Sequence, residues 1–153
     1  MEPIAPITRE IHVKAAPERA FRFFTERMGE WWPFGSYSVY HGEKARFEAP
    51  TGKGARIVEH GPDGKSCAWG EVLVWEPPRR VIFNFGAWEP GKELTEVEVT
   101  FVPDGSGTRV RVEHRGWEKL GAEAGLAREG YLQGWPKVLD ECYAGFVDAA
   151  RAA

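Results

Sequence analysis

The feature that most constrains this chain is a series of short alternating segments followed by one long helical segment. Between residues 39 and 115, runs that alternate apolar and polar residues are separated by turn sequences rich in glycine and proline. Such alternation is typical of a strand with one buried face. The polar residues of these runs are mostly charged, so the pattern predicts an antiparallel sheet with one face in water and the other face covered.

The alternation also sets the extent of each expected strand. The first strand precedes the series, at residues 7–14, and Arg9 interrupts its apolar face. The other strands are expected at residues 44–48, 55–60, 67–75, 80–85, 95–101 and 109–115. We therefore predict an antiparallel sheet of six to seven strands.

Two short helices are expected between the first strand and this series. Pro17 suits the first position of a helix, because its fixed φ angle is already helical and its missing N–H is not needed there. Gly29 and Pro33 interrupt the helical pattern that follows. A second, very short helix or turn is therefore expected to carry Trp31 and Trp32.

The longest helix is expected at residues 122–149. At about 100° per residue, its apolar side chains fall within one arc of about 120°. These residues are Tyr131, Trp135, Val138, Leu139, Cys142 and Phe146. We predict that this arc faces the sheet and that Pro136 kinks the helix near Leu132 or Gly134, or restarts it. One helix about 10 Å across cannot fill the concavity of a wide twisted sheet, so side chains fill the remainder or a cavity remains.

Composition limits the class of protein. A chain of 153 residues with 42% apolar and 28% charged residues is ordinary for a soluble protein, and we expect one domain over residues 1–153. The net charge of −3 gives no reason to expect nucleic acid as a partner. No apolar run approaches the roughly 20 residues of a membrane span, and no secretion signal is apparent. Cys67 and Cys142 are isolated, so we expect unbridged thiols and a cytoplasmic location.

Several motifs along the chain occur in an order seen in a known superfamily. They are residues 11–21 (IHVKAAPERAF), 31–34 (WWPF), 75–80 (WEPPRR), 107–110 (GTRV), 114–117 (HRGW) and 134–139 (GWPKVL). Together with the order of elements, they resemble the helix-grip fold of the START-like and birch-pollen-allergen-like superfamily (SRPBCC). Within it, they resemble the branch named after the activator of the heat-shock-protein-90 ATPase. The resemblance implies an α+β fold with a sheet wrapped around the C-terminal helix. It defines no function, because the superfamily includes lipid carriers, cyclases and dehalogenase-like enzymes.

Large aromatic residues at the ends of the expected elements are candidates for a ligand pocket. The chain has seven tryptophans, and such rigid rings suit the wall of a concave space as well as a packed centre. The candidate ligand-binding residues are Trp31, Trp32, Phe34, Trp69, Phe83, Phe85, Val99, His114, Tyr131, Trp135 and Leu139, and Trp88 is a further aromatic candidate. The alternative is that these side chains fill the space themselves.

His114 is the first candidate for catalysis. It alternates with Val110 and Val112, which places it on the apolar face of its strand. An imidazole at a pocket mouth could act as an acid or a base near neutral pH. The alternative is a buried histidine that positions Trp117.

Glu71 is the second candidate for catalysis. It shares a face of its strand with Trp69 and Trp75, but both faces are mostly apolar, so the pattern leaves open which one points inward. If Glu71 points inward, its carboxylate needs a partner, which His114 or Arg9 could supply. If the opposite face points inward, Glu71 is solvated.

These observations favour a protein that binds a small, largely apolar or aromatic molecule between the sheet and the C-terminal helix. The histidines and cysteines do not have metal-ligand spacing, and no nucleophile motif occurs, so no metal or cofactor is expected. One alternative is a cyclase- or hydrolase-like enzyme of the same fold that uses His114 as acid or base. Another is a protein-interaction module or chaperone cofactor. A binder predicts an apolar cavity, an enzyme predicts a histidine–carboxylate contact in it, and an interaction module predicts a filled core with an exposed apolar patch.

Overall fold

The computed structural model describes residues 4–42, 46–86 and 93–150, and a seven-stranded antiparallel sheet is its central element. The strand order is β1-β7-β6-β5-β4-β3-β2. Strands β2 to β7 therefore lie side by side in chain order, and β1 pairs with the last strand, β7. The strands are β1 (Ile7–Val13), β2 (Arg46–Glu48), β3 (Arg56–His60), β4 (Ser66–Glu76), β5 (Arg80–Phe85), β6 (Thr95–Asp104) and β7 (Gly107–Arg115). Each expected strand is present, because alternation and turn residues are local properties of the sequence.

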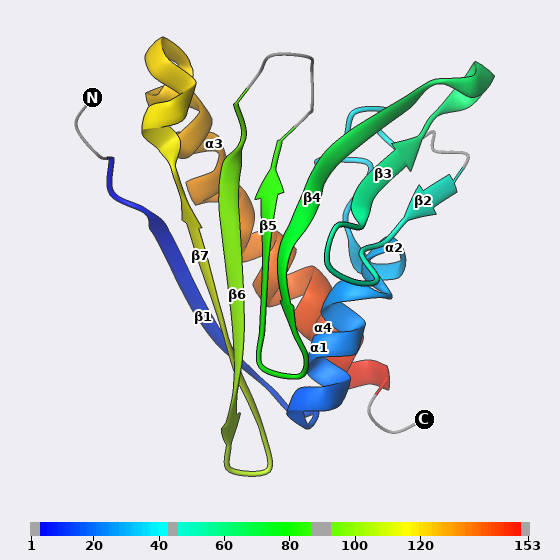
Figure 1. Cartoon of the computed structure of the whole chain (residues 1–153). Coiled ribbons are helices and arrows are strands. Elements are labelled where there is room, and N and C mark those ends of the chain that lie inside the picture. The colour runs from blue at the N-terminus through cyan, green and yellow to red at the C-terminus, as the bar shows by residue number, and fades with distance from the viewer. Residues whose placement is uncertain (1–3, 43–45, 87–92, 151–153) are drawn as a thin grey trace.

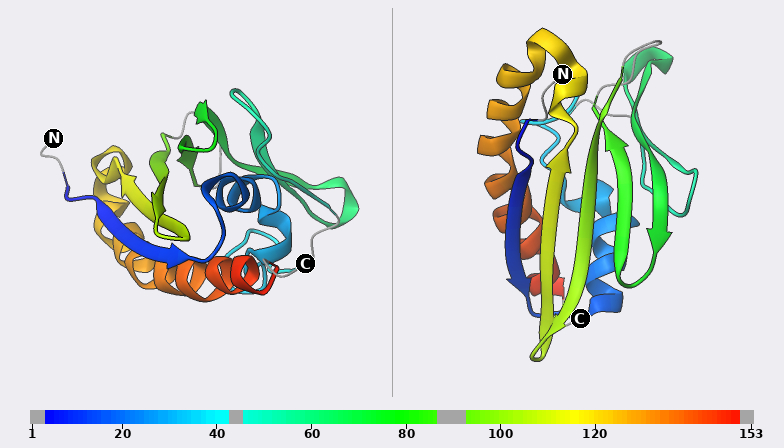
Figure 2. Two further views of the ribbon diagram at one scale, coloured as in Figure 1. Left: turned by 90° about the horizontal axis from the view of Figure 1, so that it is seen from below. Right: turned by 60° about the vertical axis from the view of Figure 1, so that its left-hand side comes forward.

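The helices lie on the concave side of this sheet. They are α1 (Pro17–Thr25), α2 (Met28–Trp31), α3 (Ala124–Trp135) and α4 (Ala144–Ala150). A 3-10 segment (Trp117–Glu123) leads into α3, and a π-helical segment (Pro136–Tyr143) joins α3 to α4. The resulting long helix runs across the sheet behind β6 and β5, and the sheet curves around it and α1 (Figures 1 and 2). The predicted helix-grip architecture is confirmed.

The long helix continues through Pro136 without a break, but it changes there from α-helical to π-helical. The backbone angles stay helical there, with φ −57° and ψ −40° at Trp135 and φ −56° and ψ −40° at Pro136. Proline has no N–H to donate to the preceding turn. The helix instead widens after it, and the Ala144 N–H reaches the carbonyl oxygen of Leu139, five residues back.

The wider turns change which residues of this helix are buried. Leu139 is buried as predicted, but Tyr143 and Val147 follow it into the core, each fully buried. Cys142 and Phe146, predicted on the apolar arc, pack against the core but are only partly buried. The most deeply buried residues are therefore displaced by one position from the predicted arc from residue 142 onward, because an ideal α-helical repeat does not hold through the π-helical segment.

Strand β4, in which the sequence left open whether Glu71 points inward, does not alternate regularly between inward and outward residues. Its pairing shifts at Trp69 against β3 and at Leu73 against β5, and each shift adds one residue to β4. As a result Trp69 and Val72 are both buried although they are three residues apart. Glu71 is half-buried, and among the described residues its backbone N–H bonds a side chain but its carboxylate does not.

The partners suggested for the Glu71 carboxylate are engaged elsewhere. The Arg9 guanidinium forms an ion pair with Asp140 on the long helix, where its Nε donates to Oδ1 over 3.1 Å. The apolar face of β1 is interrupted at Arg9 because this edge of the sheet meets a polar part of the helix. His114 bonds other groups, described below.

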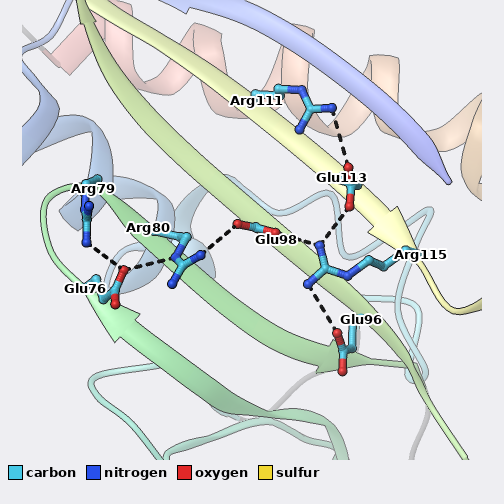
Figure 3. A network of polar contacts seen from close by, with 8 residues as sticks. All are labelled: Glu76, Arg79, Arg80, Glu96, Glu98, Arg111, Glu113 and Arg115. Atoms are coloured by element: carbon cyan, nitrogen blue, oxygen red, sulfur yellow. Dashed lines mark hydrogen bonds and ion pairs between the residues drawn. The ribbon is translucent and has the colours of Figure 1, made fainter.

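The outer face of the sheet carries a network of ion pairs (Figure 3). Arg115 lies at its centre, and its Nη1 donates to Glu98 over 2.6 Å and to Glu113 over 2.8 Å. The network comprises Glu76, Arg79, Arg80, Glu96, Glu98, Arg111, Glu113 and Arg115. This arrangement confirms that one face of the sheet is charged while the other is covered.

Candidate functional site

A pocket of about 370 Å³ opens between the inner face of the sheet, the segment after α2 and the long helix. Its walls come from three places: the residues that follow α2, the ends of β4 and β5, and one side of α3. The lining residues are Trp32, Tyr37, Ser38, Val39, Trp69, Phe85, Gly86, Leu126, Ala127, Gly130, Tyr131, Gly134, Trp135 and Val138.

Phe85 is the ring around which the wall of the pocket is arranged. Its centroid lies 5.9 Å from those of Trp32 and Tyr131, 6.3 Å from that of Trp69 and 6.4 Å from that of Trp135. Most of these pairs meet edge to face, an arrangement that aromatic rings prefer. The four rings come from three parts of the chain, namely Trp32 after α2, Trp69 on β4, and Tyr131 and Trp135 on α3, so contact with Phe85 fixes these parts relative to one another.

Among the described residues, the indole N–H groups of the pocket wall are all bonded to protein acceptors. Trp32 Nε1 donates to the carbonyl oxygen of Tyr37 over 2.6 Å, and Trp69 Nε1 donates to Glu59 Oε1 over 3.2 Å. Trp135 Nε1 donates to a buried histidine, described next. An indole has a single donor. The tryptophans therefore present their apolar ring surfaces to the pocket and no free N–H.

His114 lies behind this wall with both ring nitrogens engaged. Trp135 Nε1 donates to His114 Nδ1 over 3.1 Å, so this nitrogen carries no proton. The proton is then on Nε2, which lies 2.7 Å from Thr95 Oγ1, and the Thr95 hydroxyl donates to the carbonyl oxygen of Phe85 over 2.8 Å. Burial lowers the pKa of His114 to about 3. The imidazole is therefore neutral at neutral pH.

The contacts of His114 are those of a buried residue that packs behind the pocket wall. It is fully buried and is not among the residues that line the pocket. Within the described part of the chain, no carboxylate bonds its ring. Its carbonyl oxygen accepts from Trp117 Nε1 over 2.9 Å, and the two rings lie 4.2 Å apart. His114 is thus placed to hold Trp117 and Trp135 in position.

Glu59 is a site residue that the sequence interpretation missed. Its side chain is fully buried, and Oε1 accepts from the backbone N–H of Val39 over 3.0 Å as well as from Trp69. Oε2 accepts from the backbone N–H of Tyr40 over 3.3 Å. The carboxylate therefore joins the loop after α2 to the pocket wall. The signal in the sequence was its alternation with Ile57, which places Glu59 on the inner face of β3.

The mouth of the pocket has apolar side chains in contact with water. Leu126 is 85% exposed, Val39 is 40% exposed and Tyr37 is 39% exposed. Gly130 also lines the pocket, and a Cβ atom added there would meet no atom within 4 Å. No sequence pattern marked Tyr37, Val39 or Gly130, because a loop has no periodic pattern and a glycine has no side chain to place.

The predicted ligand-binding residues divide into two groups. Trp32, Trp69, Phe85, Tyr131 and Trp135 line the pocket. Trp31, Phe34, Phe83, Val99, His114 and Leu139 are buried and are not among the lining residues. Trp88 lies outside the described residues. The first group faces the open space, and the second packs the core behind it.

Three further observations bear on the chemistry of the chain. Over residues 4–42, 46–86 and 93–150, no group of three or more histidine, cysteine or acidic residues is arranged to hold a metal ion. No helix in the same ranges has the length and apolar character needed to cross a membrane. Cys67 and Cys142 are not joined by a disulfide, which confirms the prediction for the thiols.

Comparisons with known proteins point to one family. The family model described as Activator of Hsp90 ATPase homolog 1-like protein matches residues 14–144. The structure of Txn09, an anthrahydroquino-gamma-pyrone synthase complexed with SUM, shares 30% sequence identity and a TM-score of 0.60, covering 96% of this chain and 97% of that one. No curated protein matches the sequence.

Two other solved structures are similar in fold. Protein MLL2253 from Mesorhizobium loti has 21% identity and a TM-score of 0.67, covering 95% of this chain and 98% of that one. The Aha1 dimer from Colwellia psychrerythraea has 17% identity and a TM-score of 0.61, covering 93% of this chain and 98% of that one. At these identities the likeness concerns the fold alone.

Proposed function

Because the chain belongs to the Activator of Hsp90 ATPase homolog 1-like family, as its motifs indicated, we propose that it binds a small, largely apolar or aromatic molecule in the pocket beside α3. Family membership accounts for the fold but does not define a ligand. One observation carries the proposal: the indole N–H groups of Trp32, Trp69 and Trp135 are all bonded to protein. What remains for a ligand is a wall of ring surfaces.

The size of the pocket and one relative support this proposal. A volume of about 370 Å³ is at the small end of the roughly 300–1,000 Å³ of ligand pockets. Txn09, with 30% identity over 96% of this chain, is named as a synthase of an anthrahydroquino-gamma-pyrone, which is a polycyclic aromatic compound. A flat aromatic molecule would fit between the rings of the wall.

An enzyme of the same fold is the second candidate function, and the similarity to Txn09 favours it. His114 as acid or base remains the specific form of this candidate. Its ring bonds Trp135 and Thr95, so a proton-transfer role would require one of these bonds to open. His114→Asn separates the roles: a proton carrier would lose turnover with binding intact, whereas a positioning residue would lose binding as Trp135 moves.

An interaction role would use a different part of the molecule. The exposed apolar residues at the pocket mouth, Leu126 above all, would then contact a protein partner such as a chaperone. Such a role does not need an open pocket behind them. We also propose a cytoplasmic location and a single helix-grip domain, which the unbridged cysteines and the continuous sheet support.

The binding proposal can be tested by filling the pocket from Gly130. Gly130→Leu places a side chain where the structure has open space, and replacing glycine inside a helix favours the helix by up to about 1 kcal/mol. The variant should therefore fold as well as the wild type. Its affinity for the apolar dye N-phenyl-1-naphthylamine, followed by dye fluorescence and tryptophan quenching, should fall about tenfold or more, which is about 1.4 kcal/mol or more.

Gly145→Leu is the matched control for this experiment. Gly145 is also in a helix with open space around it, but it lies on α4, away from the pocket lining. Its dye affinity should stay within about twofold of the wild type, a difference of less than about 0.5 kcal/mol. Absence of dye binding by the wild-type protein at millimolar concentration would exclude the binding function and leave the interaction role.

A further inference from the structure

In the part of the chain that the structure describes, nearly all polar side-chain atoms that line the pocket are bonded to the protein. Besides the three bonded indoles, Ser38 Oγ donates to the carbonyl oxygen of Phe34 over 2.6 Å. Two hydroxyls of the lining remain, those of Tyr37 and Tyr131, and neither forms a hydrogen bond with a described residue. Among the described side chains of the lining, a directional contact with a ligand would therefore have to come from one of these two phenols.

The two phenols differ in their surroundings. Tyr37 is 39% exposed at the mouth of the pocket, where water competes for its hydroxyl. The Tyr131 ring packs inside the wall, with centroid distances of 4.8 Å to His114, 5.6 Å to Trp117 and 5.9 Å to Phe85. Burial raises the pKa of Tyr131, which keeps the phenol neutral and its proton available to donate. A hydrogen bond is stronger in such buried surroundings than in water.

The neighbours of Tyr131 cannot accept its proton. Both nitrogens of His114 are occupied by Trp135 and Thr95, and the indole of Trp117 has only a donor. Within the described residues, no side-chain nitrogen or oxygen is sealed in the core without a partner. The Tyr131 oxygen therefore reaches open space, and since no described residue supplies its acceptor, a ligand in the pocket can supply it.

We propose that the Tyr131 hydroxyl is the specificity-determining contact of the pocket and that it donates to the carbonyl oxygen of a flat aromatic ketone. This assignment rests on the proposed binding function and narrows its ligand class. The ring surfaces of Trp32, Trp69 and Trp135 accommodate the flat apolar part of the ligand. A carbonyl is the matching polar group, because it accepts without bringing a proton that would itself need an acceptor.

Two probes of nearly equal shape test the assignment. 2-Acetylnaphthalene carries the carbonyl, and 2-ethylnaphthalene replaces it with a methylene group. Tyr131→Phe should weaken binding of the ketone about three- to tenfold and leave the hydrocarbon unchanged, as loss of one hydrogen bond predicts. Quenching of tryptophan emission measures both affinities. In the wild type the carbonyl stretching frequency of the bound ketone should be lower than in Tyr131→Phe.

A second variant separates this effect from a general effect of losing a phenol. Tyr40→Phe removes the same atom from a tyrosine that does not line the pocket, and it should leave both affinities unchanged. The unfolding temperature of Tyr131→Phe should equal that of the wild type, because its hydroxyl bonds no described residue.

The outcomes distinguish this assignment from the function on which it rests. Equal weakening of both probes by Tyr131→Phe would show that Tyr131 acts through packing and would overturn the assignment. Unchanged affinity for the ketone would overturn it as well. In both cases the wild type still binds the probes, so the binding function stands. If neither probe binds the wild type at millimolar concentration, the binding function and the assignment fail together.

Discussion

The two faces of the sheet differ in the charge of their titratable groups, and two neighbouring residues of β7 show the difference. His114 points inward and is fully buried, and burial lowers its pKa to about 3. Arg115 points outward, where burial opposes its charge but hydrogen bonds to Glu98 and Glu113 outweigh this and raise its pKa. The inner face therefore keeps its titratable group neutral, and the outer face holds a charge among opposite charges.

The carboxylates of the two faces repeat the contrast. Glu59 on the inner face accepts only N–H groups, from Val39, Tyr40 and Trp69. Glu98 on the outer face accepts from the guanidinium groups of Arg80 and Arg115, over 3.4 Å and 2.6 Å. The inner bonds are directional and shielded from water, so they depend on geometry. The outer ion pairs face the solvent, so they depend on salt.

The largest expected effect is on the inner face, at Trp135. Trp135→Ala removes a side chain that is 2% exposed and leaves His114 Nδ1 without its donor. The free energy of unfolding should fall by about 3–5 kcal/mol in a denaturant titration. Leu126→Ala, at an 85% exposed position of the same pocket, should change it by less than about 0.5 kcal/mol. A loss below about 1 kcal/mol for Trp135→Ala would show that this part of the wall is wet rather than packed.

Glu59→Gln should give the next largest effect. The amide would direct an NH₂ group at backbone or indole N–H donors, so at least one hydrogen bond of the carboxylate is lost. We expect a loss of about 1–3 kcal/mol that does not change between low and high salt. If high salt abolished the loss, Glu59 would act through charge, like the carboxylates of the outer face.

The pH dependence of stability should report His114. Its pKa is lowered from 6.5 to about 3 in the folded protein, so below pH 6.5 the unfolded chain binds a proton that the folded chain does not. The stability from this group is therefore complete above about pH 6.5 and falls as the pH falls towards 3, by about 2 kcal/mol between pH 7 and pH 5. In His114→Asn the slope between pH 7 and pH 5 should flatten. An unchanged slope would show that groups other than His114 cause this pH dependence.

The smallest effect is expected on the outer face. Arg115→Gln removes the centre of the ion-pair network. The Arg115 side chain is 31% exposed, so water replaces much of the interaction that the carboxylates lose. The free energy of unfolding should fall by about 1 kcal/mol or less, and the loss should shrink at high salt. A loss as large as that of Trp135→Ala, independent of salt, would remove the distinction between the two faces.

Much of the fold was predictable because its signals are local. Alternation and turn residues placed each of the seven strands, and Pro17 marked the start of α1. The motifs along the chain identified the family branch that the family model confirms over residues 14–144. The candidate aromatic residues included five that form the pocket wall, Phe85 among them. These properties depend on a residue and its near neighbours in the chain.

What the tertiary structure decided depends on contacts between distant segments. The bulges at Trp69 and Leu73 arise from pairing of β4 with two different strands, and they set which residues of β4 are buried. The wider turns after Pro136 replace Cys142 with Tyr143 in the core. A periodic pattern assumes an ideal repeat, so it fails wherever a strand gains a residue or a helix changes its pitch.

The pocket itself lies beyond what the sequence determined. The sequence supplied the rings and placed Glu59 in line with Ile57, but only the folded chain joins this carboxylate to Val39 and Trp69. It also brings Gly130 and Tyr131 of α3 opposite the loop that follows α2. An open space is defined by what surrounds it, and the residues that surround this one are up to about a hundred positions apart, which no local pattern can register.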